Sequence, residues 1–152
     1  PVTQDEDGTD MRSLVEAVLK PYRNRYADRL EISGDAILLA PKTVTALGLT
    51  MHELATNALK YGALGVPKGK VSVTWQTSDE KLLIDWTETK GSSGDPYAAE
   101  GFVPGSGAGR MLMDGMLQSL QGAIETSETE GGFRARIDLP LGQVARLNSE
   151  RT

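Results

Sequence analysis

The segment that decides the fold is residues 52–64, which reads His52-Glu53-Leu54-Ala55-Thr56-Asn57-Ala58-Leu59-Lys60-Tyr61-Gly62-Ala63-Leu64. We expect it to end a helix over residues 41–61, because apolar side chains recur at helical spacing before and within it. The apolar face would be formed by Leu47, Met51, Leu54 and Ala58. Pro41 fits the first helical turn, and Gly62 is placed to end the helix in the left-handed conformation.

A second face of the same helix gathers a carboxylate, an amide and an ammonium group. Glu53, Asn57 and Lys60 are spaced i, i+4 and i+7, which places them within about 60° of arc. An amide or carboxylate oxygen can ligate Mg²⁺, and a lysine can neutralise a phosphate oxygen. A carboxylate one turn away can position or deprotonate a nucleophile. A solvated helix face with an ordinary Glu/Lys pattern has the same spacing, so both interpretations remain open.

Composition excludes several kinds of protein. The chain has 152 residues, enough for one domain, and its net charge of −5 argues against nonspecific binding of nucleic acid. It has no cysteine, which excludes disulfides, thiolate zinc sites and a cysteine nucleophile. No apolar run approaches the ~20 residues that cross a bilayer. We therefore expect a soluble cytoplasmic domain without membrane contact.

The order of the expected elements predicts the fold class. Residues 1–10 are expected to be a linker remnant, 11–141 the folded domain and 142–152 a tail, with Thr9 or Asp10 capping the first helix. Helices are expected at 11–27, where Pro21 would kink or break the helix, at 41–61 and at 109–120. Strands are expected at 30–33, 36–39, 71–77, 81–88, 123–129 and 133–139. This clustering predicts an α+β two-layer sandwich, with a mixed, mostly antiparallel sheet packed against about three helices.

A glycine-rich stretch precedes the last helix. It reads Gly105-Ser106-Gly107-Ala108-Gly109-Arg110. Glycines allow close backbone approach, and a helix N-terminus offers free N–H groups, so together they can hold an anion. The stretch fits neither the Walker A nor the Rossmann pattern, and taken alone it is more typical of a flexible joint than of an anion site.

Segment 52–64 resembles, throughout its length, the N-box of HWE-type and closely related bacterial sensor histidine kinases. Their ATP-binding domain has the Bergerat fold of the GHKL ATPases. The resemblance implies that Asn57 holds Mg²⁺, that Lys60 contacts phosphate and that Tyr61 lies near the nucleotide. It also implies that His52 and Glu53 belong to the site.

Two further motifs follow in the order of that family. Trp86-Thr87-Glu88 resembles its Trp-x-Glu motif, which implies that Glu88 accepts a hydrogen bond from the adenine amine, with Asp85 as the candidate if the register slips. Trp86 is equally explained by core packing, and Lys90 stands where the family usually has glycine. Gly107 and Gly109 correspond to the last glycine box, in which Ala108 replaces the usual phenylalanine. Residues 91–106 would be the ATP lid, and Arg110 would either touch the triphosphate or face water.

The family resemblance implies a protein-histidine kinase that binds Mg-ATP and passes the γ-phosphate to a histidine. The only histidine, His52, lies inside the N-box, so we expect the acceptor on a separate dimerization domain and this chain to be a monomeric catalytic part of a longer kinase. A response regulator would act downstream. An ATPase or protein-serine kinase on the same fold is an alternative, since Glu53 precedes Asn57 by four residues. Lys90 and Ala108 support a third interpretation, a degenerate scaffold that does not bind ATP.

Overall fold

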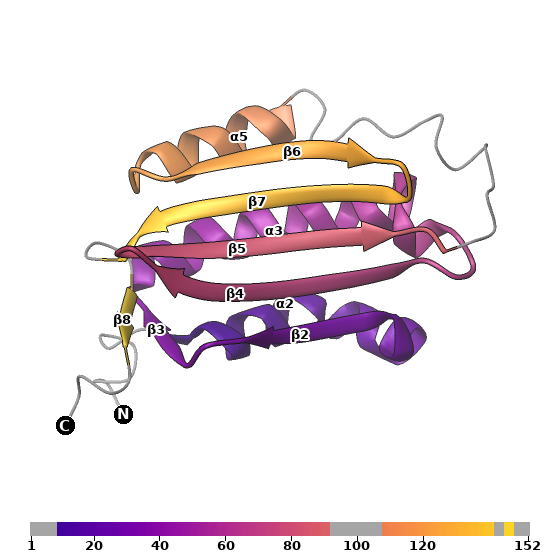
Figure 1. The fold of residues 1–152 in the computed structure, drawn as a ribbon, viewed down its shortest axis with the longest axis horizontal. Helices are drawn as coiled ribbons and strands as arrows, with labels where there is room; N and C mark the ends of the chain where they lie inside the picture. Colours follow the sequence, from indigo (N-terminus) through magenta and orange to yellow (C-terminus); the bar gives the residue numbers. More distant parts are fainter. Residues whose placement is uncertain (1–8, 92–107, 142–144, 148–152) are drawn as a thin grey trace.

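A five-stranded sheet backed by helices forms the body of the protein (Figure 1). The computed structural model describes residues 9–91, 108–141 and 145–147. The helices are α2 (Met11–Tyr26), α3 (Pro41–Tyr61) and α5 (Ala108–Gln118), with short 3-10 turns η1 (Ala27–Arg29) and η2 (Ala63–Gly65). The strands are β2 (Leu30–Gly34), β4 (Lys70–Ser78), β5 (Lys81–Thr89), β7 (Gly132–Pro140) and β6 (Ala123–Thr129), in that order across the sheet.

The sheet is mixed, as the sequence predicted. β2 is parallel to β4, and the other neighbouring strands are antiparallel. Asp79 and Glu80 both have positive φ in the turn between β4 and β5, as the favoured two-residue hairpin turns require. α2 and α3 lie behind the sheet in Figure 1, and α5 lies beside the edge strand β6. The two-layer α+β prediction is therefore confirmed.

Side-chain alternation puts the core between the sheet and the helices. On β5 the residues Leu82, Ile84 and Trp86 are buried, and on β7 the same holds for alternate residues from Phe133 to Leu139. The apolar face predicted for α3 is buried against them. None of the helices within the described ranges is long and apolar enough to span a bilayer.

Two short segments assigned to a linker and a tail take part in a second, small sheet. β1 (Thr9–Asp10) and β8 (Ala145–Leu147) flank β3 (Ile37–Leu39) with antiparallel pairing. Thr9 faces Leu39, and Leu147 faces Ile37. β1 and β8 are too short to show a periodic pattern, and their partner β3 is distant from both in the sequence. β2 pairs with β4, whereas β3 pairs with β1 and β8, so these two strands belong to different sheets although they are adjacent in the chain.

The ends of the helices only partly follow the prediction. Asp10 caps α2 as expected, since its carboxylate accepts a hydrogen bond of 3.2 Å from the Ser13 amide. Pro21 does not break α2, because the buried residues on its core face outweigh one lost backbone hydrogen bond. Gly62 has φ −123° and ψ −144°, so the prediction of a left-handed cap was wrong. An added Cβ there would lie 2.2 Å from Oε1 of Glu88, and this close approach explains the glycine.

Candidate functional site

The polar residues of segment 52–64 on helix α3 differ in how far they are exposed to solvent. The Asn57 side chain is buried, with 7% of the residue exposed, whereas Glu53 is partly buried and Lys60 is exposed. The Nδ2 atom of Asn57 is buried and has no hydrogen-bond partner among the described residues. A buried donor without a partner lowers stability by about 1–3 kcal/mol. A polar ligand that accepted a hydrogen bond from this Nδ2 atom would remove that cost.

The remaining residues predicted on this segment lie at the surface of α3. His52 is exposed, and its backbone carbonyl accepts a hydrogen bond of 2.9 Å from the Thr56 hydroxyl. Tyr61 is 42% exposed at the last turn of the helix. The structure therefore brings a buried amide and exposed basic and aromatic groups to the C-terminal half of one helix.

Glu88 joins strand β5 to the end of α3. Its carboxylate is buried, with 1% of the residue exposed. Oε1 accepts a hydrogen bond of 3.0 Å from the Ala63 amide, just past α3, and Oε2 accepts one of 2.8 Å from the Trp86 indole. Burial raises the pKa of Glu88, although these two hydrogen bonds and the charge of Lys90 act to lower it.

Asp85, the alternative adenine contact, lies on the opposite face of the sheet from Glu88. Three positions separate the two residues on β5, so their side chains point to opposite sides. Arg134 and Arg136 contact the Asp85 carboxylate at 3.1 Å. Burial acts to raise the pKa of Asp85, but the hydrogen bonds from Arg136 and Arg134 outweigh it and the pKa is lowered. Of the two acids, only Glu88 contacts the end of α3.

The unusual Lys90 prolongs the strand pairing. Its backbone N–H donates a hydrogen bond of 2.8 Å to the Gly131 carbonyl, one position beyond the last pair of β5 and β7. The chain turns one residue later, at Gly91, where φ is +78° and a glycine is favoured. The lid predicted over 91–106 lies outside the described residues, apart from Gly91.

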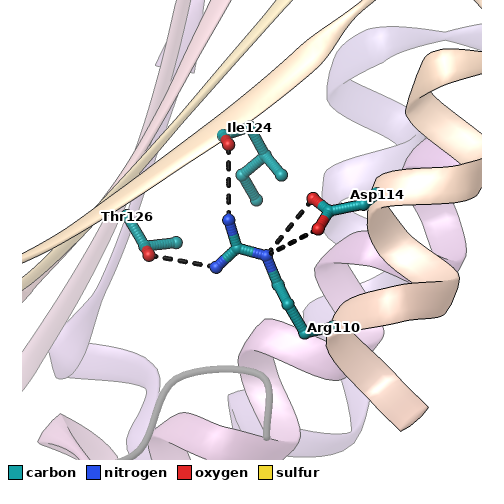
Figure 2. A network of polar contacts seen from close by, with 4 residues as sticks. All are labelled: Arg110, Asp114, Ile124 and Thr126. Atoms are coloured by element: carbon teal, nitrogen blue, oxygen red, sulfur yellow. Dashed lines mark hydrogen bonds and ion pairs between the residues drawn. The ribbon is translucent and has the colours of Figure 1, made fainter. Parts of the chain in front are cut away.

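Arg110 bridges the first turns of α5 and the edge strand β6, as Figure 2 shows. Its Nε atom lies 3.2 Å from Oδ1 of Asp114, Nη1 lies 3.1 Å from the Thr126 hydroxyl, and Nη2 lies 3.5 Å from the Ile124 carbonyl. The guanidinium is therefore bound to the protein rather than left to water. Gly107 lies outside the described residues, and Gly109 is in the first turn of α5.

An open groove of about 520 Å³ runs along the edge of the sheet. It is lined by Arg110 and by residues of β6 and β7, including Arg134 and Arg136. No residue of α3 lines it, and its arginines are paired with Asp114 and Asp85. This groove is therefore separate from the residues that the sequence singled out on α3.

Solved structures of sensor kinases share this fold. The mycobacterial sensor histidine kinase MprB aligns over 87% of this chain and 95% of its own, with a TM-score of 0.64 and 21% identity. The blue-light activated kinase EL346 of Erythrobacter litoralis aligns over 88% of this chain and 42% of its own, with a TM-score of 0.68 and 18% identity. Identities this low show the fold alone. No family model matches the chain.

Curated relatives decide the family. The chain is 45% identical over 139 residues to blue-light-activated histidine kinase 1 of Erythrobacter litoralis. The chain belongs to the HWE-type histidine kinase family. It is also 33% identical over 138 residues to the blue-light-activated histidine kinase of Brucella melitensis. These alignments span 91% and 88% of this chain but only 38% and 27% of those proteins, so the relatives carry further domains.

The described residues of this kinase domain would fit Mg²⁺ only as an ion shared with a ligand. They contain no group of three or more His, Cys, Asp or Glu side chains placed to hold a metal. Asn57 supplies one amide, whose oxygen and nitrogen exchange places when the side chain turns by half a rotation. Mg²⁺ usually keeps several waters and is shared with substrate phosphates, so a single protein ligand is compatible with it.

Sequence reasoning missed the contacts that fix the turn after α3, beside the candidate site. Arg29 donates hydrogen bonds to the carbonyls of Gly69, at 2.6 Å, and Ala63, at 3.0 Å, and so fixes the turn after α3. More than thirty positions separate Arg29 from these partners, and no local pattern indicates the contact. The Arg110–Asp114 pair was missed as well, although its i, i+4 spacing, which is typical of helical ion pairs, could have indicated it.

Proposed function

We propose that this domain binds Mg-ATP and presents the γ-phosphate to a histidine on a separate dimerization domain. The observation that carries the proposal is the buried, unpaired Asn57 amide on α3, within a segment that reads like the N-box. The Glu88 carboxylate is fixed beside the end of the same helix. These observations support the proposal, because a polar group for a metal-bound phosphate would lie on α3 and an acceptor for adenine would lie on β5, beside the end of that helix.

Each side chain would have a distinct role in binding. Asn57 would ligate Mg²⁺, which supplies positive charge to the phosphates, and the exposed Lys60 would add a second charge. A carboxylate has about four lone-pair sites, and Glu88 uses one for Ala63 and one for Trp86. Glu88 therefore keeps the capacity to accept a hydrogen bond from the adenine amine.

Catalysis would consist of positioning and charge neutralisation. Phosphoryl transfer has little covalent chemistry for the protein to perform, so orientation of the γ-phosphate toward the incoming nucleophile supplies most of the rate. Glu53, one turn before Asn57, would orient the acceptor group or accept its proton. The bound nucleotide would be covered by residues 91–106, and Gly107 and Gly109 would approach its phosphates.

Calorimetric titration of a nonhydrolysable ATP analogue, with and without Mg²⁺, tests nucleotide binding. Asn57→Ala should abolish the Mg²⁺-dependent part of the heat, because it removes the proposed metal ligand. Asn24→Ala, at an exposed position of α2, is the matched control and should bind like wild type. Undiminished Mg²⁺-dependent affinity in Asn57→Ala would refute the metal assignment.

The acceptor distinguishes the remaining activities. Phosphate transfer to a histidine-bearing dimerization domain supports the histidine kinase, whereas transfer to a serine protein or turnover to ADP alone supports the alternatives based on Glu53. A folded domain that gives no heat at millimolar nucleotide would favour the scaffold. We further propose a monomeric cytoplasmic domain, with a response regulator downstream of the complete kinase.

A further inference from the structure

We propose that Trp86 is a positioning residue of the nucleotide site, whose indole N–H orients the Glu88 carboxylate for adenine. The inference rests on the proposed ATP binding and adds a role for a residue that core packing alone would also explain. Trp86 and Glu88 are two positions apart on β5, so they share the face of the sheet that packs against the helices.

Hydrogen bonds to both oxygens of Glu88 restrain the orientation of its carboxylate. The indole N–H holds Oε2 at 2.8 Å, and the Ala63 amide holds Oε1 at 3.0 Å from the side of α3. Trp86 and Glu88 are each 1% exposed. A buried carboxylate without donors is costly, and donors on both oxygens stabilise the charged form and fix the plane of the group. Without the indole N–H, Oε2 would lose this donor, and the hydrogen bond from the Ala63 amide to Oε1 would remain.

The second tryptophan shows that packing does not require this arrangement. Trp75 is 4% exposed on the neighbouring strand β4 and faces the same core. Its indole N–H donates a hydrogen bond of 2.7 Å to the backbone carbonyl of Asp35, which carries no charge. Both indoles are satisfied, but of the two only Trp86 donates to an ionisable side chain, and that side chain contacts the end of α3.

The position of the carboxylate matters because it links two parts of the proposed site. Through Ala63, Glu88 ties β5 to the end of the helix that carries Asn57 and Lys60. Gly62 leaves the space that Oε1 occupies. A fixed carboxylate accepts from the amine of adenine and repels the carbonyl oxygen that guanine has at the same ring position. Trp86 is therefore expected to affect both nucleotide affinity and the preference for ATP over GTP.

Nuclear magnetic resonance of the indole N–H groups tests the contact directly. The chain has two tryptophans, so a ¹⁵N-labelled sample gives two indole signals. Glu88→Gln should shift the Trp86 signal and leave the Trp75 signal in place. Mg²⁺ with a nonhydrolysable ATP analogue should also move the Trp86 signal alone, because adenine and the indole share one carboxylate. A Trp86 signal that responds to neither change would overturn the inference, and this test needs no tryptophan variant to fold.

Binding measurements on this chain test the role. Trp86→Phe keeps an aromatic ring and removes the N–H donor, and Trp75→Phe makes the same change at the control position. We expect Trp86→Phe to weaken binding of the ATP analogue about tenfold, as for one lost charged hydrogen bond, and to reduce the preference over the GTP analogue. Trp75→Phe, compared at equal folded fraction, should leave both quantities within about twofold of wild type.

The outcomes separate the two proposals. If wild type binds no nucleotide, the proposed function fails and the inference fails with it. If wild type binds ATP and Trp86→Phe binds it with unchanged affinity and unchanged selectivity, only the positioning role of Trp86 is refuted.

Discussion

Replacement of Gly62 by alanine tests how tightly the end of α3 packs against β5. The φ of Gly62 is −123°, so the residue does not lie in the left-handed region that favours glycine. The added Cβ would lie 2.2 Å from Oε1 of Glu88, whereas ordinary contacts begin near 3.4 Å. The oxygen must therefore retreat by 3.4 − 2.2 ≈ 1.2 Å, which is enough to break its 3.0 Å hydrogen bond to Ala63.

The expected cost combines two effects. Overpacking a core typically costs about 1–3 kcal/mol, and losing a hydrogen bond to a charged group costs about 1.5–3 kcal/mol. Because retreat of the carboxylate relieves part of the overpacking, we expect Gly62→Ala to lower the free energy of unfolding by about 3 kcal/mol. For a domain of this size, that corresponds to a decrease in Tm of about 9 °C.

Urea unfolding followed by circular dichroism measures the effect. Gly115→Ala is the matched control, since Gly115 lies within α5 and an added Cβ meets no atom within 4 Å. Its helix propensity should improve stability by up to about 1 kcal/mol. In a Glu88→Ala background the cost of Gly62→Ala should largely disappear. A loss below about 1 kcal/mol for Gly62→Ala alone, or an undiminished cost in that background, would contradict the close packing described above.

Four further predictions concern titration and the edge of the sheet. Burial raises the pKa of Glu88 above 4.5, so ATP affinity should fall as the pH is lowered through the folded-state pKa. Calorimetric titration at several pH values should show this fall for wild type, whereas the affinity of Glu88→Gln should not change with pH in the same range. The folded state binds this proton more tightly than the unfolded chain, so the contribution of Glu88 to stability decreases as the pH rises from 4.5 through the folded-state pKa. Arg110→Ala should lower Tm by several degrees, because it frees the Ile124 carbonyl and the Thr126 hydroxyl, and a Tm equal to wild type would contradict the bridge. Asp85→Asn should cost at most about 1 kcal/mol at neutral pH, since its pairs with arginine are partly exposed. The lowered pKa of Asp85 implies that this cost is present above pH 3.8 and disappears as the pH falls through the folded-state pKa, which urea unfolding at several pH values would show.

Local pattern explains most of the secondary structure that was predicted correctly. Helix α3 has a long apolar stripe, and β4, β5 and β7 alternate over nine residues each, so their periods are unambiguous. The strands that the sequence did not predict are short and depend on distant partners. β8 has three residues, and its partner β3 lies more than a hundred positions earlier in the sequence.

For the candidate site too, the sequence was sufficient for some features, and others required the tertiary structure. The spacing of Glu53, Asn57 and Lys60 was sufficient to place a carboxylate, an amide and an ammonium group on one helix. It could not show that the Nδ2 atom of Asn57 is buried without a partner, because burial depends on what the sheet and the other helices cover. The choice between Asp85 and Glu88 likewise needed the position of β5 relative to α3.

The sequence by itself determined the fold class, the elements with strong periodicity and the types of polar residue on α3, since these depend on interactions within a few positions of the chain. Only the tertiary structure decided that Glu88 contacts Trp86 and Ala63, that Gly62 is required for space rather than for its φ, and that Arg110 bridges α5 and β6. Those contacts join side chains from elements that are separate in the sequence. Their energies depend on distances and burial that exist only once the sheet and the helices have packed together.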